Sequence, residues 1–186
     1  MGMVGFPWFL LLFIQILFIS FQPIILLAKG NPSDLIRQTC KNTKYYDLCV
    51  SSLKSDSSSP KADIKGLALI MVKVGMANAT ATIFSYLSPQ ILTAKNDTVV
   101  KKLMKECADK YGFSNEALQS SVQDLSDDLY DYAYMHVMAA ADYPNSCHNA
   151  FKRYPGLIYP KELAVRENGL KHICDVILGI IDALGF

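Results

Sequence analysis

The residues of this sequence best suited to chemistry are three histidines, five cysteines and a scatter of serines. Metal sites in helical bundles need histidine and carboxylate ligands at helical spacing, such as Glu-x-x-His on facing helices. His136, His148 and His172 form no i, i+4 pair with a carboxylate and belong to no such tetrad, so the sequence predicts no metal and no di-iron centre. No serine lies in a Gly-x-Ser-x-Gly elbow, and cysteines in an oxidising compartment make poor nucleophiles. We therefore expect a protein that is not an enzyme and needs no cofactor.

The first thirty residues indicate the compartment. A long apolar run over residues 9–27 ends in Ala28-Lys29-Gly30, where small residues stand three and one before Asn31, as a signal peptidase requires. We expect residues 1–30 to be a signal peptide. The run is also long enough to span a bilayer, so a membrane anchor is the alternative, and Pro23 and the small-residue end argue against it.

Net charge limits the partners. Removing residues 1–30 takes away one of the 18 basic residues, Lys29, and none of the 17 acidic ones, so the remaining chain has 17 of each. A protein that binds nucleic acid normally presents a basic face. The sequence therefore predicts no nucleic-acid partner, and no membrane partner after cleavage.

In the secretory pathway the five cysteines predict two disulfide bridges and one cysteine left over. Four paired cysteines allow three connectivities, and the choice of the free cysteine multiplies them. Spacing favours one set, because Cys40 and Cys49 lie close together around an expected turn, which leaves Cys107 and Cys147 for a long bridge. Cys174 falls on the apolar face of the last helical segment, where we expect a buried free thiol.

Apolar residues recur every three or four positions through most of the chain after residue 30, which predicts helices and no strand. Two short helices, capped by Ser33-Asp34 and joined by the Cys40–Cys49 bridge, should form a hairpin arm over residues 31–60. Longer helices are expected over residues 62–87, 98–125, 127–141 and 160–184. Their short connections predict an all-α fold, an up-down-up-down four-helix bundle over residues 61–186 with the disulfide-closed arm at its N-terminus.

Two prolines are expected to interrupt these helices. Ser88-Pro89 should end the first long helix, because the residue before a proline avoids the helical conformation. Pro144 should kink or break the third, since its ring removes a backbone donor and crowds the preceding turn. Helix should then resume from Cys147 to Arg153. Asp97 or Thr98 can cap the second long helix.

Two N-x-T sequons, at Asn78 and Asn96, are candidate glycosylation sites. Asn96 falls in an expected loop, whereas Asn78 falls close to the apolar stripe of a helix and is the poorer acceptor. Six of the ten tyrosines lie between Tyr130 and Tyr159. Tyrosines are enriched at protein interfaces, although these rings can also fill space around an interrupted helix.

A more specific pattern begins at the arm, which reads Thr39-Cys40-Lys41-x-x-x-Tyr45-Tyr46-x-x-Cys49-Val50 and precedes a bundle with Cys107 and Cys147. Over residues 33–184 the chain resembles the plant invertase and pectin methylesterase inhibitor family. It is most similar to the invertase-inhibiting branch. The blocks that carry this similarity are Lys65-Gly66-Leu67-Ala68-x-Ile70-Met71-Val72, Gln123-Asp124-Leu125, Tyr130-Asp131-Tyr132-Ala133-x-Met135-His136-Val137 and Asp142-Tyr143-Pro144-Asn145.

The resemblance implies a secreted helical bundle with bridges Cys40–Cys49 and Cys107–Cys147 and a free fifth cysteine. It also implies an inhibitor that binds one to one, as a monomer, at the substrate cleft of acid invertase in the vacuole or the cell wall. Pectin methylesterase is the alternative target on the same scaffold. A bundle that binds a small ligand or serves only structurally is a third interpretation.

Invertase inhibitors of this family carry Pro-Lys-Phe at the start of the third long helix, and this tripeptide enters the enzyme's cleft. Counting back from Cys147, it falls on Tyr130-Asp131-Tyr132. The predicted contacts with the target enzyme are accordingly Asp128, Tyr130, Asp131 and Tyr132. Lysine is replaced by Asp131, so a cation aimed at the two carboxylates of a glycoside hydrolase has become an anion.

Overall fold

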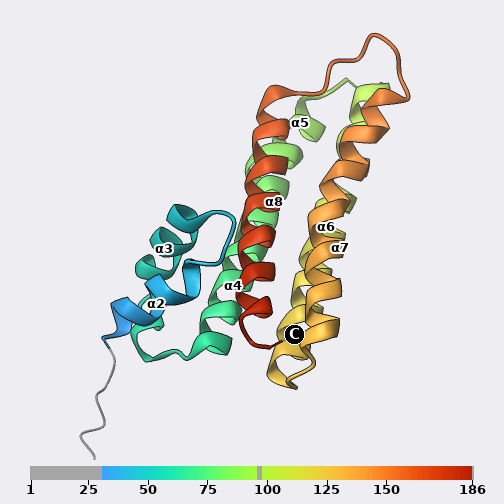
Figure 1. Cartoon of the computed structure of the whole chain (residues 1–186). Coiled ribbons are helices and arrows are strands. Elements are labelled where there is room, and N and C mark those ends of the chain that lie inside the picture. The colour runs from blue at the N-terminus through green and yellow to red at the C-terminus, as the bar shows by residue number, and fades with distance from the viewer. Residues whose placement is uncertain (1–30, 96–97, 186) are drawn as a thin grey trace, which may run out of the picture. The chain divides into compact units, whose positions relative to one another are not determined.

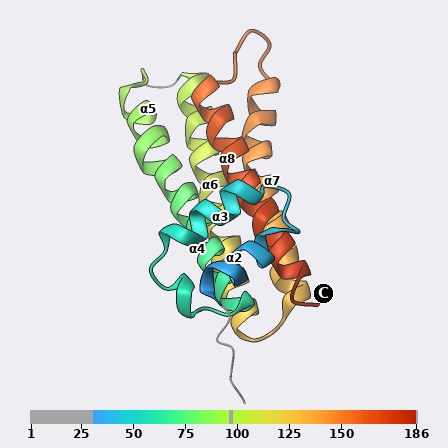
Figure 2. The ribbon, with the colours of Figure 1, turned by 60° about the vertical axis from the view of Figure 1, so that its left-hand side comes forward.

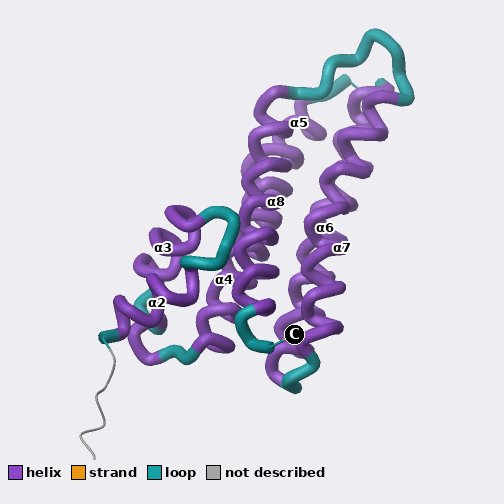
Figure 3. Tube along the Cα trace, in the orientation of Figure 1, coloured by secondary structure: helices purple, strands orange, loops and turns teal. Residues whose placement is uncertain are grey.

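The computed structural model describes residues 31–95 and 98–185, and this part of the chain is helical and contains no strand (Figure 3). The all-α prediction is therefore confirmed for these residues, while the expected signal peptide lies outside them. The elements are α2 Pro32–Cys40, α3 Tyr46–Ser55, the 3₁₀ turn η1 Ser59–Lys61, α4 Ile64–Thr82, the π-helical segment η2 Ile83–Leu87, α5 Ser88–Thr93, α6 Val99–Ser126, α7 Tyr130–Lys152 and α8 Lys161–Asp182.

The four long helices α4, α6, α7 and α8 form the predicted up-down-up-down bundle (Figure 1). Helix α4 packs against α6 and α8, and α7 packs against the same two helices from the other side. Gly75 allows α4 to approach closely, because a Cβ there would lie only 3.1 Å from Leu118 Cδ1. By length and composition Ile64–Thr93 resembles a membrane span, but Leu67 and Met71 are fully buried in the bundle core.

The prediction that the first long helix ends at Ser88-Pro89 is wrong. The helix continues through η2 into α5 and ends at Thr93. In η2 the backbone widens by one residue, so that Ser88 N–H donates to the carbonyl of Ile83, five residues earlier. Pro89 then occupies the first turn of α5, where its missing N–H costs little. The π-helical turn thus accommodates the proline without breaking the helix.

Helix α7 likewise runs unbroken from Tyr130 to Lys152 with Pro144 inside it, so the predicted interruption is wrong. Proline at 144 removes the N–H that would bond the carbonyl of Ala140. The hydroxyl of Ser114 on α6 donates to this carbonyl instead, at 3.0 Å, and Ser114 is fully buried. A side chain from the neighbouring helix therefore replaces the lost backbone hydrogen bond.

The substitution Ser114→Ala is expected to lower the free energy of unfolding by about 1–3 kcal/mol, because it leaves the buried Ala140 carbonyl without a donor. Adding Pro144→Ala should recover most of this loss, since residue 144 then supplies its own N–H. Urea unfolding of the single and double variants measures both effects. Ser120→Ala is the matched control, because the Ser120 hydroxyl also bonds a carbonyl of α6 but is exposed. A loss for Ser114→Ala no larger than that of the control would contradict this account.

The arm consists of α2 and α3, joined by the Cys40–Cys49 disulfide with 5.7 Å between the Cα atoms. Its first helix is capped by Asn31 rather than by Ser33-Asp34, because the Asn31 side-chain oxygen accepts from Ser33 N–H at 3.2 Å and Pro32 takes the first helical turn. The two helices lie against α4 and α8 (Figure 2).

Side chains of the α2–α3 turn hold the arm on α8. The ring of Tyr45 stacks on His172 with 4.0 Å between centroids, and Lys44 Nζ pairs with an Asp175 carboxylate oxygen at 3.1 Å. Gly179 makes room for the turn, since a Cβ at this position would lie 3.1 Å from the Cα of Thr43. The arm is therefore part of the same packed unit as the bundle.

The second disulfide, Cys107–Cys147, joins α6 to α7 with 4.8 Å between the Cα atoms. Cys174 is free and fully buried on α8. Burial, with a smaller contribution from the Asp175 carboxylate, raises the pKa of the Cys174 thiol to about 12. The thiol therefore stays protonated, and an inert free cysteine sits in the core.

Candidate functional site

The candidate site is the turn between α6 and α7, at the end of the bundle where α4 begins (Figure 1). Helix α6 ends at Ser126, and Leu129 N–H returns to the carbonyl of Asp124 at 2.8 Å. Asp128 at the centre of the turn has φ of 59°, a left-handed conformation that aspartate tolerates better than most residues. The turn thereby projects the first residues of α7 away from the core.

Hydrogen bonds from a lysine of α4 and a tyrosine of α7 hold the turn in place. Lys65 Nζ on α4 donates to Asp128 Oδ1 at 2.8 Å, and the hydroxyl of Tyr130 donates to the same oxygen at 2.7 Å. The hydrogen bond from Lys65, followed by that from Tyr130, holds the pKa of the Asp128 carboxyl below its ordinary value. The carboxylate in turn raises the pKa of both donors.

Two further contacts secure the flanks of the turn. Gln123 Nε2 donates to Asp127 Oδ2 at 2.8 Å. His136 Nδ1 on α7 lies 2.6 Å from Asp124 Oδ2 on α6. Together with the Lys65–Asp128–Tyr130 group, these contacts connect the turn to α4, α6 and α7.

The four predicted contact residues come together here, around a shallow hollow of about 190 Å³. Asp131 and Tyr132 are exposed in the first turn of α7, and no hydrogen bond or ion pair joins Asp131 to another described residue. We call the four contact residues, Asp128, Tyr130, Asp131 and Tyr132, the tip. The residues that line the hollow are Asp128, Leu129, Tyr130, Asp131, Tyr132 and Gly185.

The sequence alone did not predict that the site also includes Lys65, Gln123, Asp124 and His136. Lys65 precedes Asp128 by 63 positions, and no local pattern indicates that the two meet. The only signal is that all four residues lie in the sequence blocks shared with the inhibitor family.

The histidines lie far apart in the fold. His136 faces Asp124, His148 stacks on Tyr159 with 4.2 Å between centroids, and His172 stacks on Tyr45. Among the described residues no group of three or more histidine, cysteine or acidic side chains could hold a metal ion.

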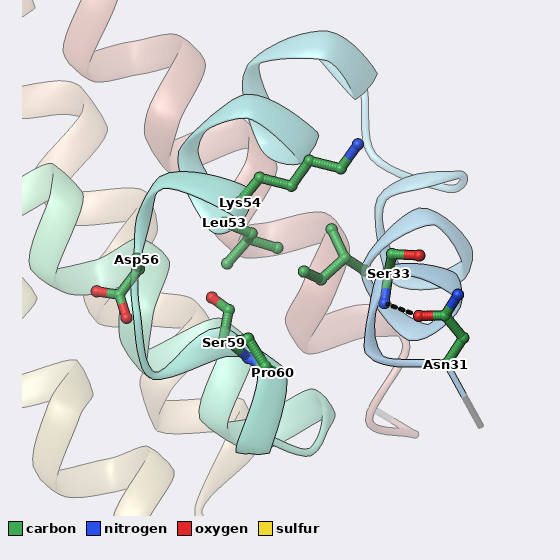
Figure 4. Close-up of a pocket in the computed structure, with 8 residues that line it drawn as sticks. Asn31, Ser33, Leu53, Lys54, Asp56, Ser59 and Pro60 are labelled. Atoms are coloured by element: carbon green, nitrogen blue, oxygen red, sulfur yellow. Dashed lines mark hydrogen bonds between the residues drawn. The ribbon is translucent and has the colours of Figure 1, made fainter. Parts of the chain in front are cut away.

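A second hollow, of about 300 Å³, lies between the arm helices and η1 (Figure 4). Its floor is formed by the buried side chains of Ile36 and Leu53, beside Pro60. The buried hydroxyl of Ser59 at its edge has no hydrogen-bond partner. Asn31, Ser33, Lys54 and Asp56 also line the hollow. The Asn31 and Asp56 side-chain oxygens already accept hydrogen bonds from Ser33 N–H and Ser58 N–H, whereas small-molecule sites usually converge several polar groups that are free to bind a ligand.

One of the two sequons, that at Asn78, lies within the described residues. Asn78 is half-buried on α4, its side-chain oxygen is buried, and its side-chain nitrogen would lie 3.9 Å from a Cβ on Gly169 of α8. The side chain thus lies at the α4–α8 contact, where a glycan has little room. Asn96 lies outside the described residues.

In the protein with Lys65→Met, the pH at which Asp128 titrates is expected to rise toward 3.8, the ordinary value for an aspartate. Because the folded-state pKa is lowered, these hydrogen bonds stabilise the turn above the ordinary pKa and are lost only as pH falls through the lowered value. The tip should therefore stay fixed between about pH 4.5 and 6.5, above the aspartate range. Carboxyl carbon NMR shifts of Asp128 measured against pH test this, with Lys102→Met on α6 as the control. Equal midpoints in wild type and Lys65→Met would contradict the assignment.

The family model for plant invertase/pectin methylesterase inhibitors matches residues 34–180. The chain is 49% identical over 175 residues to the cell wall/vacuolar inhibitor of fructosidase 2 of Arabidopsis thaliana, covering 94% of this chain and 97% of that one. It is 41% identical over 156 residues to pectinesterase inhibitor 28 of rice, Oryza sativa subsp. japonica, covering 81% and 69% of the two chains. The crystal structure of a pectin methylesterase inhibitor from Arabidopsis thaliana superposes with a TM-score of 0.58 at 22% identity, covering 83% of this chain and 98% of that one, which shows a shared fold. The chain therefore belongs to the plant invertase/pectin methylesterase inhibitor family.

Proposed function

We propose that this protein is a secreted inhibitor of plant acid invertase and not itself an enzyme. The observation that carries the choice of target is the 49% identity, over nearly the whole of both chains, to a relative named an inhibitor of fructosidase. The tip supports the mode of action. Its residues stand where invertase inhibitors of the family present a cleft-binding tripeptide, and the Lys65–Asp128–Tyr130 group holds them ready to bind.

In this proposal the tip enters the substrate cleft and the protein acts as a monomer, one copy to one enzyme. A preorganised turn favours tight binding, since little conformational freedom is lost on docking. The two disulfides suit an oxidising compartment. We place the protein in the vacuole or the cell wall, after removal of residues 1–30 as a signal peptide, and expect a glycan at Asn96 rather than at Asn78.

Pectin methylesterase is the second candidate target, and Asp131 is the observation that favours it. An exposed carboxylate at the tip suits a cleft that binds an anionic substrate better than a cleft that contains two acidic side chains. The rice relative at 41% identity is named a pectinesterase inhibitor. Binding of a small ligand is the weaker interpretation, because the Asn31 and Asp56 oxygens at the hollow of the arm already accept local hydrogen bonds.

The test is a titration of the secreted, oxidised protein against acid invertase and against pectin methylesterase at about pH 5. We expect sucrose hydrolysis to fall to zero near a one-to-one ratio while methylesterase activity is unchanged. The reverse result would make pectin methylesterase the target. No effect on either enzyme would refute the proposal and leave a structural or ligand-binding bundle.

A further inference from the structure

A row of exposed apolar side chains continues from the tip along α7. Leu129, Tyr132, Met135 and Met138 are 46%, 58%, 64% and 48% exposed. They follow one another at three-residue steps, each of which rotates the side chain by about 60° around the helix axis and advances it by about 4.5 Å. The row therefore winds halfway round the helix from Leu129 to Met138, with each side chain next to the last, and we call it the α7 ridge.

The fold does not use the α7 ridge. The core face of α7 is provided by small residues, and Ala133, Val137 and Ala140 are fully buried. None of the four ridge side chains belongs to the buried core or to the partly buried shell packed around it. Exposed methionines and tyrosines in a contiguous row are typical of protein-binding surfaces, because methionine adapts its shape and tyrosine offers a large rigid ring.

Other exposed apolar residues lack this arrangement. Leu92 on α5 and Ile158 in the α7–α8 connection are 81% and 90% exposed, but both segments lie at the opposite end of the bundle from the tip (Figure 1). Val165, 60% exposed, lies on α8. The α7 ridge, in contrast, adjoins the tip without a break, because Leu129 and Tyr132 also line the hollow there.

Charge indicates what kind of surface the ridge fits. Helix α7 has no lysine or arginine before Lys152. Asp142 is exposed, and no hydrogen bond or ion pair joins it to another described residue. Residues 131, 135, 138 and 142 share one helical face. Asp142 follows the last ridge residue on this face and lies about 16 Å from Asp131 along the helix axis. A cleft that takes in the tip leaves Asp142 outside, at its rim.

We propose that the α7 ridge docks on the rim of the enzyme that the tip inhibits, in an apolar depression bordered by a lysine or arginine that pairs with Asp142. This inference rests on the proposed function and adds a second contact region to it. The tip blocks the cleft, whereas the ridge supplies apolar contact area outside it. Truncating the ridge should therefore speed dissociation, and reversing the charge of Asp142 should slow association.

The test compares Met135→Ala/Met138→Ala with Leu92→Ala/Val165→Ala, a control that removes two exposed apolar side chains elsewhere. Alanine favours helix and all four positions are exposed, so both variants should melt as the wild type does. We expect the inhibition constant toward the target enzyme to rise at least tenfold in the ridge variant and less than twofold in the control. Asp142→Lys should lower the association rate severalfold at low salt, and the same charge change at exposed Asp109 on α6 should not.

The outcomes separate the two proposals. If the wild-type protein inhibits an enzyme and the ridge variant matches it in inhibition constant and dissociation rate, the ridge inference is wrong while the proposed function stands. A ridge variant that weakens inhibition no more than Leu92→Ala/Val165→Ala also overturns the inference. If the wild-type protein inhibits neither enzyme, the proposed function fails and the ridge inference fails with it.

Discussion

Replacing Cys107 and Cys147 together by alanine is expected to lower the free energy of unfolding by about 4 kcal/mol, and replacing Cys40 and Cys49 by about 2.6 kcal/mol. The difference follows from the length of chain that each bridge closes, since the paired residues are 40 and 9 positions apart. A bridge across a longer segment removes more conformational freedom from the unfolded chain. Loss of both would cancel a large part of the roughly 5–15 kcal/mol that stabilises a typical domain.

Urea unfolding of the two double variants and of the protein lacking all four cysteines measures these values. Double replacements are needed because a single unpaired partner could bond with Cys174 in the unfolded chain. Cys174→Ala serves as the control, since it removes a fully buried sulfur that forms no bridge. Hydrogen exchange should show a second difference: the arm variant loses protection mainly in α2 and α3, whereas the bundle variant loses it throughout. Equal losses from the two double variants would contradict the loop-length account.

Asp131→Lys is expected to lower the inhibition constant toward acid invertase by roughly tenfold to a hundredfold, about 1–3 kcal/mol. The substitution replaces an exposed anion of the first turn of α7 by a cation that faces the two carboxylates of a glycoside hydrolase cleft. Inhibition of pectin methylesterase should change in the opposite direction, because demethylation leaves anionic uronic acid units and a cleft that holds this product favours a negative tip. The pair of measurements thus reports on the electrostatics of each target as well as on the inhibitor.

Control variants separate local charge from net charge. Asp109→Lys makes the same change at an exposed position of α6, about 26 Å along that helix from its end near the tip, and should have little effect on inhibition. Asp131→Lys should lower the melting temperature only slightly, because Asp131 forms no ion pair with another described residue and loses only its charge–dipole interaction in the first turn of α7. Equal effects at positions 109 and 131 would show that Asp131 does not enter the cleft.

Asp131→Asn keeps the shape of the side chain and removes its charge, so its inhibition constant toward acid invertase should lie between those of the wild type and Asp131→Lys. An inhibition constant equal to that of the wild type would show that the charge at position 131 does not act on the cleft.

Local patterns were sufficient for the helices and the bundle, whereas the position of the tip followed from the family resemblance. The three-and-four spacing of apolar residues predicts each long helix, and Thr98 caps α6 as expected, with its hydroxyl accepting from Lys101 N–H. What the sequence could not reveal depends on tertiary partners. Pro144 alone predicts a break in the helix, but in the fold the Ser114 hydroxyl bonds the Ala140 carbonyl and the helix continues. Pro89 alone predicts a helix end, but the backbone widens at residues 83–87 and the helix continues there too. Lys65 belongs to the site only because folding brings the start of α4 to the α6–α7 turn.

The Ser114–Ala140 hydrogen bond limits the order in which substitutions at these positions can be accepted. With any residue other than proline at 144, the backbone satisfies the Ala140 carbonyl and the Ser114 hydroxyl is dispensable. With Pro144 present, losing that hydroxyl leaves a buried acceptor unpaired. A proline introduced at 144 therefore costs less stability when serine already stands at 114. In this chain position 144 can be varied while Ser114 is kept, whereas position 114 can be varied without loss only after Pro144 has been replaced.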